Sequence, residues 1–457
     1  MATIKITLYI ASYIVYNLFF HPLRRFPGPL LMRATRAADC YRHWRGDLSF
    51  YVLELHRRHG DVVRIAPNEL AFADPSAWKE VMGHRTGGGV NGGKAPPEFE
   101  KMEVFYRPIA DLPRDIITTR GPEHAMLRRQ LSHGFSDRSL REHEPVIMRY
   151  VEHFIQRMRE AIKGRDLAFG ESFGCLEEEK LHSWVRTFFM MIKAGVALQT
   201  ASHFPVLRRL ITAAMERRLQ HQDMTMQKLV RRIELGEREG PRADLIEGLL
   251  RKKEEWNLSL TQLDGNTSIL IIAGSETTAT LLSGVTYLLL KNPEKMRKLV
   301  REVRTAFKRE EEITLASVNA LAYMLACLDE ALRMVVPEGG ATVSGEFVPG
   351  KMTVSIHHWA MYHNKKNFKN PFVFHPERFL GDPEYASDRR EAFQPFHLGP
   401  RKRLGKNLAY VEMRIVLARL LWNFDLELAE DSERWMDDQK IYTLWEKGPL
   451  NVYLRAR

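Results

Sequence analysis

The stretch from Glu123 to Phe307 constrains the fold most, because its charged and apolar residues recur with a helical period and few prolines interrupt them. A last helix is expected from about Gly405 to Phe424. The sequence also predicts four short strands, seen as β-branched and apolar runs between turn residues: Val62–Ile65, Glu69–Phe72, Ala341–Phe347 and Met352–Ile356. The first two flank Pro67-Asn68 and are expected to pair as a hairpin. The 457 residues therefore predict one large, mainly α domain with a small β-rich part.

The first residues differ from the rest of the chain. Ile6–Phe20 carries no charge, and the arginines Arg24-Arg25 follow it closely. These fifteen residues are fewer than the ~20 that span a bilayer comfortably, so a buried first helix stays open as an alternative. The tyrosines of the run suit a membrane interface, and the arginines are expected to hold the following chain on the cytoplasmic side. We predict a single-pass membrane anchor at 1–22, a Pro-rich hinge at 23–30 and a folded domain at 31–457.

The net charge of +11 raises the question of an anionic partner. Basic runs such as Arg251-Lys252-Lys253 lie beside acidic residues such as Glu254-Glu255, which favours a solvated surface over a phosphate-binding patch. No nucleic-acid partner is expected, whereas an acidic protein partner is compatible with the charge. The three cysteines, Cys40, Cys175 and Cys327, lie far apart, which indicates a reducing compartment rather than a disulfide framework or a zinc site.

Two groups of polar residues interrupt apolar helical patterns. Ala273-Gly274-Ser275-Glu276-Thr277-Thr278 lies inside a helix expected from about Thr267 to Leu290. Its hydroxyls can bond back to the preceding turn and leave a notch for a ligand, although a buried helix with satisfied threonines is the default interpretation. Glu330 and Arg333 stand three residues apart, so they can pair on one helix face, as many surface pairs do.

The order of these groups gives them meaning. Phe396-His397-Leu398-Gly399-Pro400-Arg401-Lys402-Arg403-Leu404-Gly405 resembles Phe-x-x-Gly-x-Arg-x-Cys-x-Gly, the haem loop of the cytochromes P450. It follows the threonine helix, Glu330-Ala331-Leu332-Arg333 and Pro376-Glu377-Arg378-Phe379 in the family's order. The segment Lys406–Arg414 resembles fungal secondary-metabolite members. The resemblance covers nearly the whole chain and implies the cytochrome P450 fold, a single large domain behind the anchor.

The resemblance also implies roles for individual residues. Glu276 and Thr277 would relay protons to bound dioxygen, and Glu330, Arg333 and Arg378 would form a structural triad. The remaining matches would bind the cofactor, haem (heme b), by contacting its propionates or shaping its loop: His124, Arg128, Gly399, Arg401 and Gly405.

The family's members of this type act in the endoplasmic reticulum membrane, with the catalytic domain in the cytoplasm. They use NADPH, a flavoprotein reductase and O2 to hydroxylate lipophilic small molecules. A monooxygenase of fungal secondary-metabolite biosynthesis is therefore the activity that the resemblance implies.

The pattern is broken at the iron ligand. Arg403 stands where the family has cysteine, and a guanidinium has only donors, so it cannot coordinate a metal. His397 lies six residues earlier and is the imidazole that could replace the thiolate, though a polar loop residue is the default interpretation. The chain after Arg333 is also about ten residues shorter than the family expects before the strands, whether by deletion or by a misplaced gene boundary.

Three functions stay open on this sequence. The first is a monooxygenase with impaired or altered chemistry. The second is a catalytically inactive cytochrome P450-fold protein that binds a metabolite or a partner enzyme. The third is a haem-independent enzyme that uses Glu276 as an acid and Arg403 as a cation.

Overall fold

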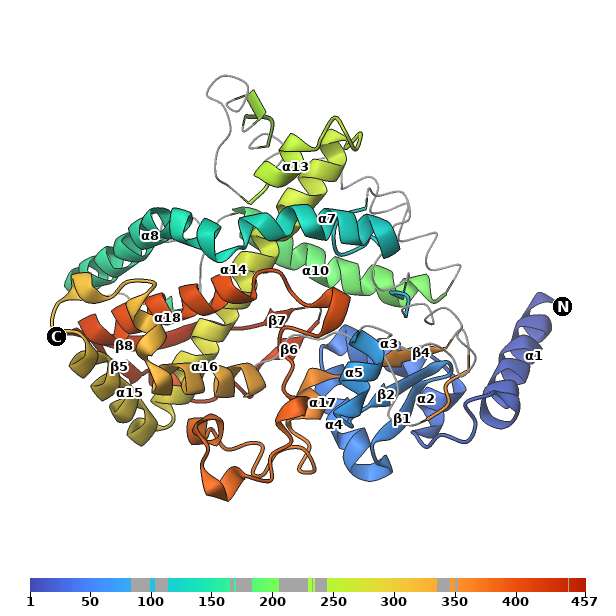
Figure 1. Cartoon of the computed structure of the whole chain (residues 1–457). Coiled ribbons are helices and arrows are strands. Elements are labelled where there is room, and N and C mark those ends of the chain that lie inside the picture. Colours follow the sequence, from blue (N-terminus) through green and yellow to red (C-terminus); the bar gives the residue numbers. More distant parts are fainter. Residues whose placement is uncertain are drawn as a thin grey trace, which may run out of the picture.

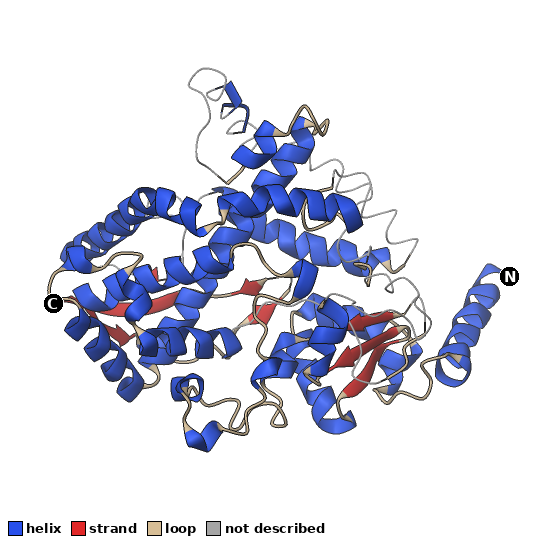
Figure 2. Cartoon of the chain, viewed as in Figure 1, coloured by secondary structure: helices blue, strands red, loops and turns tan. Residues whose placement is uncertain are grey.

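The structure, a computed structural model, is mostly helical with small sheets (Figure 2). It describes residues 1–83, 99–102, 114–164, 168–169, 183–204, 229–231, 233–234, 245–334, 346–349, 352–442 and 444–457. The mainly α fold class with a small β-rich part is confirmed.

The helices lie in chain order as follows: α1 Ala2–Val15, α2 Leu30–Ala34, α3 Ala37–Arg45, α4 Leu48–His59, α5 Ser76–Met82, α7 Gly121–Gly134, α8 Asp137–Gly164, α10 Ser183–Ser202, α13 Glu247–Arg251, α14 Leu260–Leu290, α15 Pro293–Ala306, α16 Ala322–Met334, α17 His358–Tyr362 and α18 Lys406–Asn423. A π-helical turn, Tyr16–Phe20, continues α1. Two 3-10 turns matter below, Pro376–Leu380 and Gly399–Arg401.

The long helix α14 runs through the middle of the body (Figure 1). It begins at a capping box in which Ser259 and Gln262 satisfy each other's backbone N–H groups. The apolar run alone predicts a start about seven residues later, at Thr267, because the polar capping box precedes that run. Its carboxyl half packs with α15, α16 and α18 around the largest apolar cluster, which includes Val285, Leu328 and Leu417. This packing fixes α14 against the helices that carry the other candidate residues.

Two sheets lie at opposite ends of the body (Figure 1). In one, β1 Val62–Ala66 pairs antiparallel with β2 Glu69–Phe72, which pairs in parallel with β4 Thr353–Ser355. The predicted hairpin and the strand in 352–356 are thus confirmed. The predicted strand 341–347 falls mostly outside the described residues, and Glu346 and Phe347 are irregular.

The second sheet closes the carboxyl end of the chain. Its strands are β5 Phe424–Leu428, β8 Leu450–Ala456 and β3 Ala168–Phe169, in the order β3-β8-β5 with antiparallel pairing. A two-stranded piece, β6 Lys440–Ile441 with β7 Trp445–Glu446, precedes β8. The turn between β7 and β8 reaches α14, which brings the end of the chain to the candidate site.

The amino terminus projects away from the body as α1 (Figure 1). Thr3–Phe20 and α14 are each long and apolar enough to cross a membrane, but α14 is packed inside the body, whereas Thr3–Phe20 is only 6% buried. The apolar helix at the predicted anchor is therefore present and exposed.

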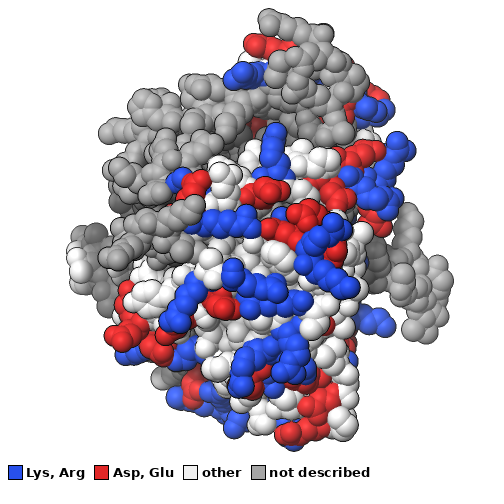
Figure 3. Space-filling view, turned by 90° about the vertical axis from the view of Figure 1, so that its left-hand side faces the viewer, with Lys and Arg blue, Asp and Glu red and all other residues white. Residues whose placement is uncertain are grey.

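Charges of both signs cover the face that Figure 3 shows. Elsewhere among the described residues, ion pairs join neighbouring elements, for example Arg304 with Asp425 and Arg159 with Glu310. The described part of this face therefore has interspersed charge, as the sequence predicts for a solvated surface.

Candidate functional site

The polar residues of α14 lie beside open space. Ile271, Ala273 and Gly274 are exposed although the helix crosses the body, and a side chain added at Gly274 would meet no atom within 4 Å. The Thr277 hydroxyl donates to the Ala273 carbonyl at 2.6 Å, and Thr278 donates to Gly274 at 3.0 Å. The hydroxyls bond back to the preceding turn as expected, yet α14 stays a continuous α-helix. The feature is thus an open helix face rather than a break in the helix.

Glu276 on this helix is neutralised by a residue from the end of the chain. Its carboxylate pairs with the ammonium group of Lys447, in the turn between β7 and β8, and accepts a hydrogen bond from Thr280 at 3.1 Å. Lys447 also donates to the Thr280 hydroxyl at 3.2 Å. The side chains of Lys447 and Glu276 are 7% and 12% exposed, so the pair is shielded from water. Sequence reasoning missed Lys447, which lies 171 residues from Glu276.

A second acid reaches α14 from α18. The Glu412 carboxylate accepts a hydrogen bond from Thr278 at 3.4 Å. Burial raises the pKa of Glu412 to about 7, because the charged form loses water and the Thr278 hydroxyl compensates only in part. Glu412 is therefore a titratable group at the back of the same helix segment.

Two predicted cofactor ligands lie one turn apart on α7. His124 and Arg128 are both partly buried. Burial alone lowers the pKa of Arg128, and no carboxylate among the described residues pairs with it. A half-buried guanidinium of this kind is suited to an anionic group.

The loop 396–405 is closed by its own backbone and held against α5. The Arg403 N–H donates to the Phe396 carbonyl at 3.0 Å. Gly399 has φ +61°, and a Cβ at this position would lie 2.1 Å from the carbonyl oxygen of Met82, so only glycine fits. Arg401 ends the 3-10 turn, and the position of its side chain lies outside the described structure. Gly405 is the N-cap of α18.

Arg403 lies close enough to the buried His358 to influence its pKa. Burial holds the pKa of His358 well below 6.5, and the charges of His397 and Arg403 lower it further. The His358 ring is fully buried, 5.1 Å from the ring centre of His397 and 4.7 Å from that of Trp78. Of the two described cysteines, Cys40 lies on α3 and Cys327 on α16, so neither belongs to this loop.

These two cysteines are buried thiols rather than thiolates. Burial raises the pKa of Cys40 to about 12 and that of Cys327 well above 9.0. Cys175 lies outside the described residues. The described part of the chain thus offers no thiolate in place of the missing ligand.

The structure brings Glu330, Arg333 and Arg378 together. Glu330 accepts two hydrogen bonds from Arg333, at 2.8 and 2.7 Å, and one from Arg378 at 3.1 Å. All three side chains are fully buried or nearly so. Asp388 supplies a second carboxylate to Arg378 at 2.6 Å, which sequence reasoning missed. The cluster ties α16 to the segment before the haem loop.

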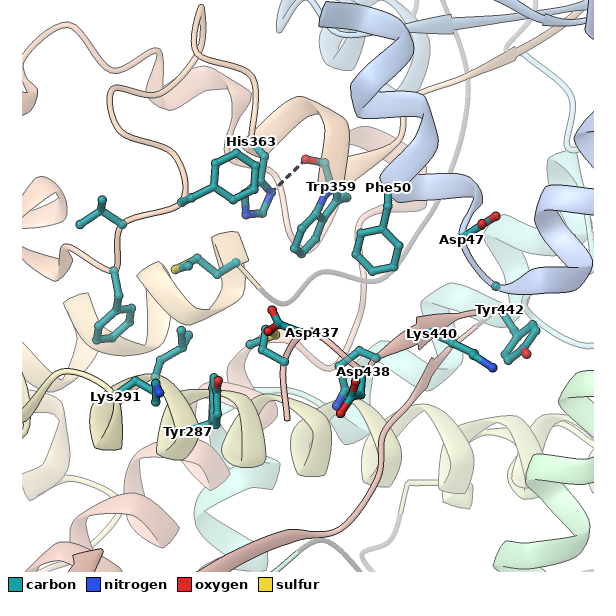
Figure 4. A pocket seen from close by; sticks show the side chains of 18 of the residues that line it. Asp47, Phe50, Tyr287, Lys291, Trp359, His363, Asp437, Asp438, Lys440 and Tyr442 are labelled. Carbon is teal, nitrogen blue, oxygen red and sulfur yellow. Dashed lines mark hydrogen bonds between the residues drawn. The ribbon is translucent and has the colours of Figure 1, made fainter. Parts of the chain in front are cut away.

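A cavity of about 1190 Å³ lies at the other end of α14 (Figure 4). Aromatic side chains, including Phe50 and Trp359, line it together with charged ones such as Lys291 and Asp437. His363 stacks on Trp359 and donates to its carbonyl at 3.0 Å. None of the predicted cofactor or proton-relay residues lines this cavity, so it is separate from the candidate site.

The family model "Cytochrome P450" matches residues 26–452. The chain belongs to the cytochrome P450 family. Cytochrome P450 monooxygenase prhB of Penicillium brasilianum is 43% identical over 486 residues, covering 99% of this chain and 97% of that protein. Cytochrome P450 monooxygenase astA of Talaromyces wortmannii is 41% identical, covering 97% and 94%. The trichothecene C-15 hydroxylase of Fusarium sporotrichioides is 37% identical, covering 98% and 96%. The homologues are thus cytochrome P450 monooxygenases of fungal secondary-metabolite pathways.

Membership of the cytochrome P450 family brings haem and electrons from a redox partner as the family's general chemistry. The alignment with prhB spans 486 positions, whereas this chain has 457 residues, so at least 29 positions have no counterpart here. Such missing positions agree with a chain that is shorter than its relatives.

Proposed function

We propose that this chain is a cytochrome P450 of fungal secondary metabolism that keeps the scaffold for a lipophilic small molecule but has lost the haem-thiolate reaction. The observation that supports the proposal is Arg403, which stands in the ligand position of a loop whose sequence otherwise matches the family pattern. The backbone closure at Phe396 and the close approach at Gly399 preserve the loop. The loop is therefore held by its own backbone and by α5, with Arg403 in the ligand position.

The residues present fit the propionates of haem but not its iron. Arg128 is a half-buried cation suited to a propionate, and His124 lies one turn before it. At the iron position, Arg403 has no lone pair to donate and adds positive charge beside His358. Haem b would supply oxygen activation only with an iron ligand, which Arg403 does not offer. The proton-relay roles proposed for Glu276 and Thr277 therefore carry no step in this chain.

What remains is binding. The exposed face of α14 at Ile271 and Gly274 offers apolar and open surface, and the Glu276–Lys447 pair removes net charge beside it. Such a surface favours a lipophilic molecule over an ionic one. The inactive, metabolite-binding function is thus better supported than a haem-independent enzyme, because the acid that the latter needs is already paired with Lys447.

We infer that the anchor at 1–22 holds the chain in the endoplasmic reticulum membrane, with the folded domain at 31–457 in the cytoplasm. The exposed apolar helix α1 supports the anchor. In active relatives the partner would be a flavoprotein reductase that transfers electrons from NADPH, and the net charge of +11 suits an acidic partner.

Oxygen consumption tests the proposal. Full-length chain, supplied with haem during expression, is mixed with a fungal flavoprotein reductase and NADPH, and oxygen uptake is followed with and without CO. We expect no CO-sensitive uptake above that of the reductase alone, and CO-sensitive uptake from Arg403→Cys. CO-sensitive uptake by the unaltered chain would overturn the proposal. If Arg403→Cys binds haem but stays inactive, the shortened segment after Arg333 is the heavier lesion.

A further inference from the structure

The anchor helix is attached to the folded domain by a buried charge. Arg64, in β1, is fully buried, yet no carboxylate among the described residues pairs with it. Its guanidinium donates to the Pro67 carbonyl through Nε at 2.9 Å and Nη2 at 2.5 Å, and through Nη1 to the carbonyl of Asn17 at 2.9 Å. Burial, with the charge of Arg33, lowers the pKa of Arg64 to about 10. A charge buried this way is retained at a cost, which points to a specific role.

The acceptor Asn17 belongs to the anchor. It lies in the π-helical turn Tyr16–Phe20 that ends the apolar helix, and it is 2% exposed. Its side chain donates to the Ala34 carbonyl at 2.9 Å, where α2 ends. The end of the anchor is thus bonded from both sides by the folded domain.

The linker after the anchor is packed as well. Leu23 and Phe26 are buried, and the Pro27 carbonyl accepts the Arg64 N–H at 2.7 Å. A Cβ at Gly28 would lie 2.2 Å from the Arg64 carbonyl oxygen, so the chain can pass here only with glycine. At these residues the predicted hinge is therefore packed against the folded domain and held in one conformation.

The surface that follows is apolar with basic neighbours. Leu30 and Leu31 on α2 are 65% and 70% exposed, directly after the linker that carries the exposed Arg24 and Arg25. Exposed leucines beside arginines fit the boundary between acyl chains and phosphate headgroups. The surface is continuous with α1, which argues for a lipid occupant rather than a protein one.

The length of the free helix also indicates that more than the helix enters the bilayer. Because Asn17 is seated in the domain, the helix projects freely over Ala2–Tyr16, although the side chains of Phe19 and Phe20 stay exposed. Fifteen helical residues cover roughly 22 Å of a hydrocarbon core of about 30 Å. A bilayer matches such a short helix by thinning, or the protein matches the bilayer by immersing more of itself.

We propose that Arg64 fixes the anchor to the folded domain, so that α1, residues 21–29 and α2 enter a phospholipid bilayer as one rigid unit. The inference rests on the proposed membrane anchoring and is independent of haem. The linker would then be rigid rather than flexible. Because the free part of the helix is shorter than the hydrocarbon core, Leu30 and Leu31 would be immersed in the bilayer as well.

Trypsin tests the rigid attachment in the full chain in detergent micelles, where no bilayer shields the linker. Cleavage after Arg24 and Arg25 is expected to be slow. It should accelerate roughly ten- to hundredfold in Arg64→Met, which loses a charged donor, and roughly two- to tenfold in Asn17→Ala. Arg58→Met, at an exposed arginine on α4, is the matched control and should cleave like the unaltered chain.

The bilayer seat is tested separately, by an environment-sensitive fluorophore on Leu31→Cys in phosphatidylcholine vesicles with about one-fifth phosphatidylserine. Its emission should shift to the blue on vesicle binding, whereas the same label on Lys298→Cys, an exposed position on α15, should not. Equal linker cleavage in the unaltered chain and Asn17→Ala overturns the attachment, even if Arg64→Met fails to fold. If the label at Leu31 keeps the emission it has in water while the protein is bound to vesicles, the immersion of Leu31 is overturned. If the protein fails to float with the vesicles in a density gradient, the membrane anchor itself is overturned.

Discussion

Glu412 is expected to make the stability of the folded chain depend on pH. Its pKa is about 7 in the structure against an ordinary value of 4.5, because burial disfavours the charged form. The folded state therefore holds a proton that the unfolded chain releases between these values. This contribution is fully present below about pH 4.5 and is lost as the pH rises through about 7. The difference corresponds to about 3 kcal/mol of unfolding free energy.

Glu412→Gln replaces the protonated acid by a neutral amide and should remove this dependence. We expect the variant to exceed the unfolding free energy of the unaltered chain by about 1 kcal/mol at pH 5 and by up to about 3 kcal/mol at pH 8. Urea unfolding followed by pulse proteolysis, at pH values from about 5 to 8, measures both free energies. Glu142→Gln, at an exposed pair with Arg138, controls for the loss of a carboxylate. A difference between Glu412→Gln and the unaltered chain that does not change with pH would refute the reasoning.

Three further predictions about the scaffold use the same unfolding measurement. Glu330→Gln takes the shared carboxylate from two buried arginines and should lower the free energy of unfolding by about 3–5 kcal/mol, far more than the exposed control Glu142→Gln. A loss below about 1 kcal/mol would show that the cluster is not a structural unit. Gly399→Ala should lower the free energy of unfolding by at least about 1–3 kcal/mol, because Gly399 has a positive φ and faces the Met82 carbonyl. Gly274→Ala, at an open position on a helix, should be neutral or stabilising. Equal effects of the two changes would contradict the close approach at Gly399. Lys447→Met should cost about 3–5 kcal/mol and be largely rescued by adding Glu276→Gln, and additive effects of the two changes would argue against the pair.

The elements of the fold were readable where local pattern decides them. The hairpin at Pro67-Asn68, the apolar helix around Gly274 and the last helix after Gly405 all follow from periodicity and turn residues. The true start of α14 could also have been predicted, because Ser259 and Gln262 form a capping-box pattern. The apolar run does not include these residues, so the predicted start at Thr267 is too late.

The contacts that decide the site were not readable, because they join residues that only the tertiary fold brings together. Lys447 meets Glu276 across 171 residues, and Arg64 meets the backbone of Asn17 across 47. A backbone carbonyl leaves no mark on the sequence at all, so the attachment of the anchor has no sequence signal. Glu412 reads as one acid of an amphipathic helix, and only burial against Thr278 distinguishes it.

The spectrum of the reduced, CO-treated haem complex reports which group, if any, binds the iron in place of the missing thiolate. The full chain, Arg403→Cys and Lys402→Cys are loaded with haem under the same conditions; Lys402 is exposed and places a thiol one residue from the ligand position. We predict the thiolate-type Soret band that names the family in Arg403→Cys alone. A thiolate-type band from the unaltered chain would contradict the account, and an imidazole-type spectrum lost in His397→Ala would show that His397 had taken the ligand's place.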